Sequence, residues 1–299
     1  MSTSKQTWLQ DPDLFMAMDD LELAAKAVVE GAIHGLHRSP YIGFSVEFDS
    51  HREYQFGDDL RHVNWNLWAK TDDLYIKEFQ SDTNLNLYLL MDTSGSMRAE
   101  NGMSMKWRYA ARAAAALTYL SLDSRDATGC YLLGSRVDDC VTPKIRPGQF
   151  VEILAMMEGV DPQGEANLGK AMHEVTELVK RKGIVILFSD MYDNEEKTFG
   201  HLCDLKNMGH EVIVMHMIDP WETDLPEKGH YEFTDLEDGT KLRANSAIVR
   251  KAYKKIFSDW QKDLRRRCIN TGIDWVTVNT REPLKEVIID YLIKRARLY

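Results

Sequence analysis

The stretch Leu85–Ser96 reads LNLYLLMDTSGS, an apolar run followed directly by a carboxylate and by two serines at alternate positions. An apolar run of this length is typical of a strand buried on both faces of a parallel sheet. In open α/β sheets, ligands bind beyond the carboxyl ends of such strands. Asp92, Ser94 and Ser96 would lie at that end, and their oxygen atoms suit Mg²⁺ or Mn²⁺. Asp and Ser also favour turns and helix caps, so a purely local role is the alternative.

Beyond Met91, strand patterns alternate with helix patterns, which predicts parallel strands joined by crossover helices. Strands are predicted over residues 85–91, 127–133, 137–141, 184–188, 211–218 and 274–278. Helices are predicted over residues 106–122, 149–157, 168–182, 195–208, 247–268 and 283–297. Ser104 and Asn167 are candidate N-caps, and Pro283 suits a first helical turn. The expected fold class is α/β, a doubly wound, mostly parallel, six-stranded Rossmann-like sheet.

The segment before this sheet has a different pattern. Residues 14–36 carry apolar side chains at helical spacing, which predicts an amphipathic helix. Residues 42–78 alternate like short strands. We therefore expect a helical and β-rich extension over residues 1–84, packed on a main domain over residues 85–299. Within the main domain, a polar insertion is expected at about 221–245, with a predicted hairpin tip at residues 237–240.

Composition narrows the classes of partner. The formal net charge of the 299-residue chain is -10, which argues against a sequence-independent grip on nucleic acid or anionic lipid. The longest apolar runs fall far short of the ~20 residues that span a bilayer, and the N-terminus lacks an apolar signal core. We expect a cytoplasmic protein without a membrane span. Its four cysteines are then buried free thiols, although a Cys130–Cys140 disulfide remains open.

Several motifs in fixed order resemble the bacterial domain-of-unknown-function family 58. The residues that carry the resemblance are His37–Pro40, Glu47–Phe48, Arg52–Tyr54, Gly57–Asp59, Arg61, Trp65, Ala69–Lys70, Asp92–Met97, Phe188–Asp190, Asp219–Pro220, Asp235–Gly239 and Gly272–Asp274. The resemblance implies a von Willebrand factor A-like fold with a metal-ion-dependent adhesion site. It also implies association with a MoxR-type AAA ATPase, for which such proteins act as adaptor or co-chaperone.

In sites of the kind implied, one loop supplies Asp, Ser and Ser, a second supplies Thr, and a third supplies Asp. Asp92, Ser94 and Ser96 match the first loop, and Asp190 matches the third. The second loop departs from the pattern, because Ala166 stands where the threonine hydroxyl is expected. Water could replace that ligand, Glu165 or Asn167 could swing in, or the metal could bind weakly.

Two functions of different class follow from these residues. The first is a non-enzymatic interaction module whose divalent metal accepts an exposed Asp or Glu of a protein client, because sparse protein charge leaves the cation under-neutralised. The second is a metal-dependent hydrolase or phosphatase with Asp92 as nucleophile. Such enzymes usually place a second carboxylate two residues after the nucleophile, where this chain has Ser94. The interaction module is therefore the preferred prediction.

Overall fold

The computed structural model describes residues 50–53, 75–78, 85–101, 105–164, 166–192 and 195–296. The helix predicted over residues 14–36, the candidate N-cap Ser104 and the candidate ligand Glu165 lie outside these residues. The chain divides into two compact units, one of which spans residues 41–84. The described part of that unit is an antiparallel pair of strands, β1 (Ser50–Glu53) and β2 (Tyr75–Glu78). A β-rich segment was expected here, and its packing on the main domain stays a prediction.

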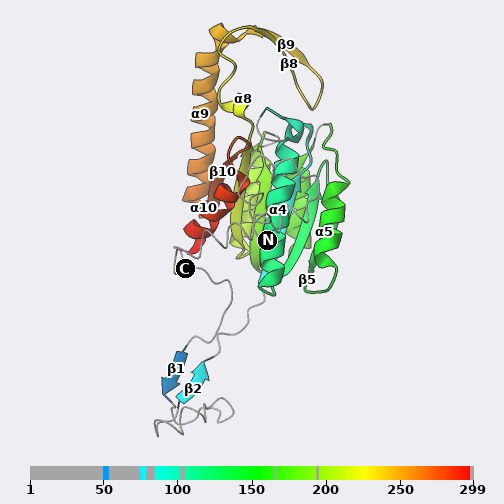
Figure 1. Ribbon diagram of the computed structural model, residues 1–299, viewed down its shortest axis with the longest axis vertical. Helices are drawn as coiled ribbons and strands as arrows, with labels where there is room; N and C mark the ends of the chain where they lie inside the picture. Colours follow the sequence, from blue (N-terminus) through cyan, green and yellow to red (C-terminus); the bar gives the residue numbers. More distant parts are fainter. Residues whose placement is uncertain are drawn as a thin grey trace, which may run out of the picture. The chain divides into compact units, whose positions relative to one another are not determined.

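A six-stranded sheet forms the centre of the larger unit (Figure 1). Its strands are β3 (Asn86–Asp92), β4 (Ala127–Leu133), β5 (Val137–Lys144), β6 (Gly183–Ser189), β7 (Glu211–Ile218) and β10 (Asp274–Asn279). They lie in the order β10-β7-β6-β3-β4-β5, and all neighbours are parallel except β4 and β5. From β5 to β10 the order runs third, second, first, fourth, fifth, sixth along the chain, which is the doubly wound order of Rossmann folds. The predicted fold class is confirmed.

Burial explains why these segments form strands. Strands β3, β4 and β6 are covered on both faces, so nearly every side chain along them is buried, as in other parallel sheets. The edge strand β5 is mostly exposed and contains Pro143. Pro143 lies next to Gly129 of β4, where the register of the β4–β5 pair shifts, and proline is tolerated at such a break in the hydrogen bonding of an edge strand.

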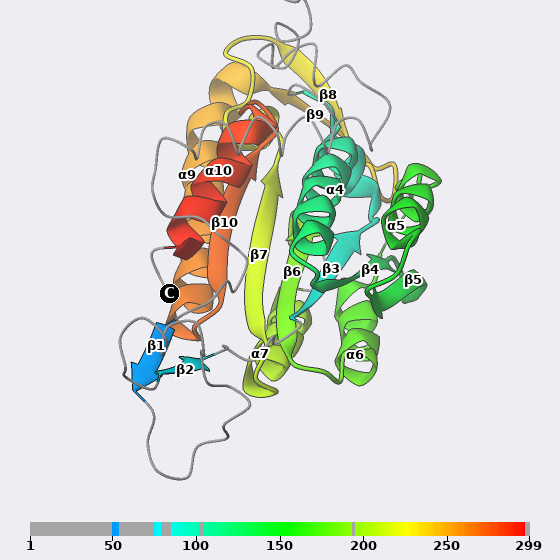
Figure 2. The same ribbon diagram turned by 60° about the horizontal axis from the view of Figure 1, so that its bottom comes forward.

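Helices cover both faces of the sheet (Figure 2). They are α4 (Lys106–Asp123), α5 (Gln149–Glu158), α6 (Leu168–Leu178), α7 (Glu195–Asn207), α9 (Ser246–Asn270) and α10 (Leu284–Ala296). One face packs on α6, α7 and α9, where Tyr88 and Leu90 of β3 share a core with Met172, Leu205 and Leu264. The other face packs on α4, which in turn contacts α5 and α10. The alanines of α4 are buried and let that helix approach the sheet closely.

The predicted element boundaries hold within a few residues, with one larger difference. Helix α6 ends at Leu178 and not at residue 182. The Tyr88 hydroxyl donates a 2.8 Å hydrogen bond to the Arg181 carbonyl, so the segment after α6 is fastened to β3 outside the helix. Asn167 caps α6 as predicted, because its Oδ1 accepts from the Lys170 amide at 2.9 Å.

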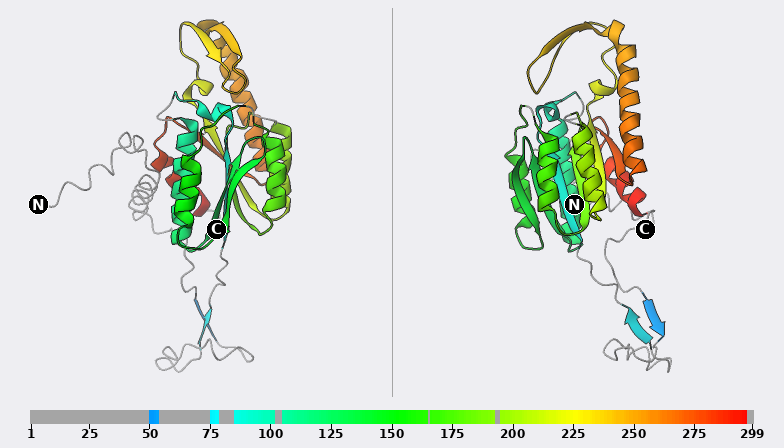
Figure 3. Two further views of the ribbon diagram at one scale, coloured as in Figure 1. Left: turned by 90° about the vertical axis from the view of Figure 1, so that its right-hand side faces the viewer. Right: turned by 180° about the vertical axis from the view of Figure 1, so that it is seen from behind.

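The insertion before α9 forms a short helix and a hairpin. Helix α8 (Pro220–Thr223) is followed by strands β8 (His230–Thr234) and β9 (Lys241–Asn245), which pair in antiparallel fashion. The connecting turn contains Gly239 at a φ of 74°, a conformation that favours glycine. The hairpin arches from the start of α9 above the sheet (Figures 1 and 3). The predicted hairpin tip at residues 237–240 is confirmed.

Two simpler expectations can be compared with the structure. All four cysteines are free, and Cys130 and Cys268 are buried as predicted, whereas Cys203 is half-buried and Cys140 is exposed. Its predicted burial is wrong because it lies on the edge strand β5, where most side chains face outward. In the part of the chain that the structure describes, the helices are too short or too polar to cross a lipid bilayer.

Candidate metal centre

The first loop of the candidate site begins at the last residue of β3. Asp92 is 2% exposed, and its two carboxylate oxygens accept hydrogen bonds from the Ser94 amide (2.9 Å) and the Ser189 hydroxyl (2.6 Å). The hydroxyl oxygens of Ser94 and Ser96 lie 3.0 Å apart. Ser94 is buried and Ser96 is half-buried, so this pair of oxygens runs from the interior towards the surface.

Asp190 directly follows the neighbouring strand β6 and lies at the same carboxyl-terminal end of the sheet as Asp92. Strands β3 and β6 are parallel, and Met91 pairs with Phe188, so the residues that follow each strand lie next to one another. Asp190 is 1% exposed, and its Oδ1 accepts from the Tyr192 amide at 3.3 Å. The structure therefore brings Asp92, the two serines and Asp190 together, as the sequence predicts.

The two carboxylates place more negative charge in the interior than their neighbours neutralise. Burial, and then the nearby charge of Asp190, raise the pKa of Asp92 to about 7, although hydrogen bonds from Ser189 and Ser94 oppose the shift. The buried imidazole of His216 lies 3.1 Å from the Asp190 carbonyl oxygen. Burial lowers the pKa of His216 to about 4, so this side chain is neutral at pH 7 and adds no positive charge.

Lys106 supplies the one positive charge that the described structure places against Asp190. Its ammonium donates to Asp190 Oδ2 at 2.7 Å and to Glu222 Oε1 at 2.6 Å, and its side chain is 0% exposed. Glu222 belongs to α8 and also accepts from the Asp219 amide. Sequence reasoning missed Lys106. The sequence feature that could have identified it is a lysine in the first turn of a predicted helix, where the helix dipole disfavours positive charge.

The second loop lies against the first without supplying a hydroxyl. The Gly95 amide donates to the Gly164 carbonyl at 3.0 Å, and the Asn167 amide donates to the Gly134 carbonyl at 3.1 Å. These bonds hold the segment with Ala166 at the site. The Asn167 side chain is exposed and already caps α6, so it is engaged away from the serines.

The tip of the β8–β9 hairpin also reaches the first loop. Gly95 is buried, and a Cβ at this position would overlap the carbonyl oxygen of Leu236 and lie 3.2 Å from the Cα of Glu237. Only glycine allows so close an approach of two backbones. This contact between the polar insertion and the predicted site was not visible in the sequence, because Leu236 lies far along the chain from Gly95.

The donor atoms of this group fit a hard divalent cation. They are carboxylate and hydroxyl oxygens, the type that Mg²⁺ and Mn²⁺ prefer, and the two carboxylates are both buried. Within the described residues, no group of three or more His, Cys, Asp or Glu side chains is arranged as a metal site. A centre here would therefore depend on the serine hydroxyls as much as on the carboxylates.

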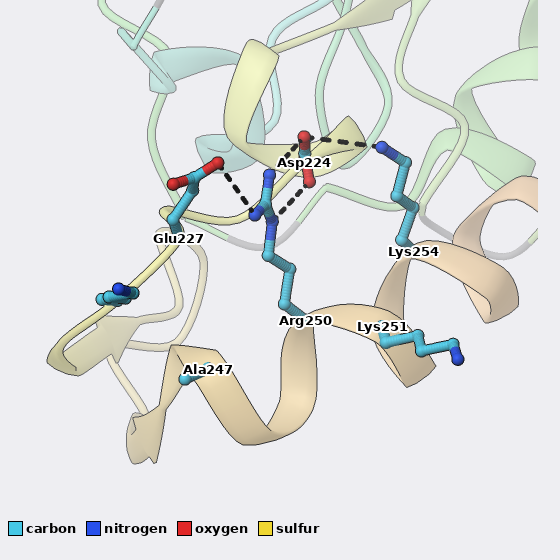
Figure 4. A pocket seen from close by; sticks show the side chains of 7 residues that line it. Asp224, Glu227, Ala247, Arg250, Lys251 and Lys254 are labelled. Carbon is cyan, nitrogen blue, oxygen red and sulfur yellow. Dashed lines mark hydrogen bonds and ion pairs between the residues drawn. The ribbon is translucent and has the colours of Figure 1, made fainter.

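A second charged cluster lies between α8 and the start of α9 (Figure 4). The Arg250 guanidinium donates two 2.7 Å hydrogen bonds to Asp224 and lies 3.5 Å from Glu227, and Lys254 lies 3.4 Å from Asp224. The hydrogen bonds from Arg250 lower the pKa of Asp224. Because its charges already pair with one another, we interpret this cluster as a fastening of α8 to α9.

Relatives of the chain have been described without an assigned activity. It is 23% identical over 295 residues to the uncharacterized protein Mb1516 of Mycobacterium bovis, covering 97% of this chain and 92% of that protein. The uncharacterized protein Rv1480 of Mycobacterium tuberculosis shows the same identity and the same coverage.

Solved structures with a similar arrangement include two bacterial proteins and one isolated domain. The conserved hypothetical protein BatB from Bacteroides thetaiotaomicron has a TM-score of 0.46 and 17% identity, covering 72% of this chain and all of that one. An aerotolerance-related membrane protein from Bacteroides fragilis has a TM-score of 0.45 and 14% identity, with 70% and 99% coverage. The SpRpn10 VWA domain has a TM-score of 0.40 and 10% identity, with 69% and 94% coverage.

A family model matches residues 50–263, which include both strands that lead into the candidate site. The family is described as DUF58, proteins of unknown function. The match covers most of the chain, so the protein belongs to the DUF58 family.

Proposed function

We propose that this chain is a non-enzymatic protein-interaction module with a divalent metal at the carboxyl ends of β3 and β6. The observation that carries the proposal is the convergence of two buried carboxylates, Asp92 and Asp190, with the hydroxyl pair of Ser94 and Ser96. Bound Mg²⁺ or Mn²⁺ would supply a Lewis-acidic position for a carboxylate of another protein.

Each residue of the site then has a distinct part. Ser94 and Ser96 offer neutral oxygens, and the half-buried Ser96 marks the side from which a partner approaches. Asp92 and Asp190 supply negative charge from behind, held in place by Ser189 and Lys106. With Ala166 in the second loop, the chain contributes one oxygen ligand fewer than the sites it resembles, and water would take that position.

The partner we propose has two components. Family resemblance supports a MoxR-type AAA ATPase, for which this chain would serve as adaptor or co-chaperone. The chemistry of the site supports a client protein with an exposed Asp or Glu. The client would be held at the metal, while the ATPase performs the energy-dependent work.

Metal binding is tested first by titrating the full chain with MnCl₂ and MgCl₂ in a calorimeter. We expect saturable binding in the wild type and its loss in Asp92→Ala. Ser94→Ala, which removes one hydroxyl ligand, is compared with the matched control Ser258→Ala. The control changes a serine on α9 and should bind the metal like the wild type. No binding heat in the wild type, confirmed by equilibrium dialysis, contradicts the proposal.

The partner is tested by co-purification with a MoxR-type ATPase from the same genome. We expect the complex to form in Mg²⁺, to dissociate in EDTA, and to be lost in Asp92→Ala and Ser94→Ala. A complex that is indifferent to EDTA and to both substitutions would remove the metal from the interaction.

A metal-dependent phosphatase is the competing function, and the geometry disfavours it. Such an enzyme needs a lysine or threonine that can reach the phosphoryl oxygens. The Lys106 ammonium is fully buried between Asp190 and Glu222, so a substrate cannot contact it without breaking that pair. Hydrolysis of p-nitrophenyl phosphate in Mn²⁺ that Asp92→Asn abolishes would reverse this ranking.

A further inference from the structure

Lys106 is an unusual residue for its position. It is the first residue of α4, where the helix dipole opposes a cation, and its side chain is fully buried. Removing an ammonium group from water costs several kcal/mol unless good partners surround it. Two carboxylates surround this ammonium group, since Asp190 Oδ2 lies 2.7 Å and Glu222 Oε1 lies 2.6 Å from its nitrogen. Lys106 is therefore a buried cation held by two ion pairs.

This cation compensates the two carboxylates of the site unequally. Asp190 receives the ammonium of Lys106 directly, at 2.7 Å. Asp92 receives only neutral donors, the Ser94 amide and the Ser189 hydroxyl. Glu222 shares the ammonium at 2.6 Å and thereby reduces how much of its charge is felt at Asp190. Glu222, Lys106 and Asp190 therefore form a chain of two ion pairs that connects α8 to the carboxyl end of β6.

We infer that Lys106 is a positioning residue that weakens the hold of the site on a divalent cation and strengthens its hold on an incoming carboxylate. This inference rests on the proposed function. A fixed positive charge behind Asp190 repels an arriving cation, because like charges at close range in a buried region interact strongly. The same charge cancels part of the protein's own negative potential, so an external carboxylate meets less repulsion and more attraction at the surface.

Glu222 acts in the opposite sense through Lys106. Neutralising Glu222 would leave the whole ammonium charge to Asp190, whereas neutralising Lys106 would release the charge of both carboxylates. The two substitutions therefore shift metal affinity in opposite directions. A role that is only structural predicts instead that both substitutions damage the site.

The experiment measures Mn²⁺ binding by electron paramagnetic resonance on the full chain. It compares Lys106→Met and Glu222→Gln with the wild type and with the exposed-site control Lys262→Met. Sodium acetate is the carboxylate probe, detected by the loss of water-proton relaxation as it displaces metal-bound water. We expect Mn²⁺ to bind Lys106→Met about tenfold more tightly than the wild type, and Glu222→Gln several-fold more weakly. Acetate should bind the Mn²⁺-loaded Lys106→Met more weakly than the wild type, and the Mn²⁺-loaded Glu222→Gln more tightly. The control should resemble the wild type.

The outcomes separate this inference from the proposed function. If the wild type binds no Mn²⁺, both are wrong. If the wild type binds Mn²⁺ but the two variants change its affinity in the same direction, or not at all, only the role of Lys106 is wrong. Should Lys106→Met fail to fold, Glu222→Gln decides alone, because glutamine has the size of glutamate and keeps one oxygen that can accept from Lys106. The inference then requires weaker Mn²⁺ binding together with tighter acetate binding in Glu222→Gln, and any other combination overturns it.

Discussion

At the scale of single residues, two features bear on the strength of the proposed metal site. Ala166 lacks the expected hydroxyl, and Lys106 neutralises Asp190 from inside the molecule. Both features reduce the negative field that a bound cation would feel. The expected consequence is a weak metal site with strong dependence on a partner's carboxylate.

Restoring the hydroxyl should strengthen the site. We predict that Ala166→Thr tightens Mn²⁺ binding about tenfold, because it adds an oxygen ligand in a loop already held by the Gly164 and Asn167 backbone bonds. Ala166→Val has the shape of threonine without the hydroxyl and should bind like the wild type. Calorimetric titration checks both variants, and equal tightening in both would show that shape, and not a ligand, is responsible.

A buried histidine away from the site should give stability a pH dependence. Burial lowers the pKa of His210, whose ring meets Tyr88 edge-on and is close to the charge of Lys182. Below about pH 6.5 the unfolded chain binds a proton that the folded chain resists. The contribution of His210 is therefore complete above that pH and is lost as the pH falls.

Urea unfolding from pH 7 to pH 5 measures this effect. We expect the decline in unfolding free energy to be shallower in His210→Gln than in the wild type. The exposed His230→Gln should keep the slope of the wild type. An unchanged slope in His210→Gln would show that this ring titrates equally in the folded and unfolded states.

At the scale of elements, the polar insertion contacts the candidate site at two places, through α8 and through the hairpin tip. Helix α8 presents Glu222 to Lys106, and Asp219 at its N-terminus accepts hydrogen bonds from the Asn101 backbone and side chain. The hairpin tip packs against Gly95. A sequence indicates a turn from local residues, but it does not show which distant loop the turn will contact.

The hairpin contact makes a specific demand on Gly95. We predict that Gly95→Ala displaces the tip, because its Cβ would overlap the Leu236 carbonyl, and costs about 1–3 kcal/mol of stability. Hydrogen exchange should accelerate at the amides of residues 235–240, where Asp235 and Thr240 close the turn. The result would contradict the close packing if exchange there stayed slow.

Gly200→Ala is the matched control for this substitution. Gly200 is exposed within α7, and a Cβ there meets no described atom within 4 Å. Alanine should stabilise the helix by roughly 0.5–1 kcal/mol and leave exchange in the hairpin unchanged. The opposite signs of the two alanine substitutions distinguish the backbone contact at Gly95 from a general effect of replacing glycine.

At the scale of the whole molecule, a metal that binds only the folded chain should raise its stability. At about one hundred times the dissociation constant, Mg²⁺ would contribute ~2.7 kcal/mol. For a domain of this size, that is a rise in Tm of roughly 5–10 °C. Differential scanning calorimetry should show this rise in the wild type and a flat response in Asp92→Ala. Equal rises in both proteins would place the stabilising ion elsewhere.

The alternation of strands and helices was predictable because each signal is local. The apolar run of β3 is buried on both faces, and the alanine-rich segment of α4 has a high helix propensity. Local patterns also placed Asp92 and Asp190 after strands, and the rule for parallel sheets then brought the two strand ends together. The early end of α6 escaped prediction because a hydrogen bond from Tyr88, on another element, holds the segment that follows.

The sequence by itself determined the doubly wound sheet, its helices and the two carboxylates at its edge, because hydrophobic period and strand order act through near neighbours in the chain. Only the tertiary structure decided that Lys106 would be buried against Asp190 and that the hairpin would cover Gly95. Both contacts join residues more than eighty positions apart. Their charge and shape complementarity exists only after the sheet and the insertion have packed, so no local pattern encodes it.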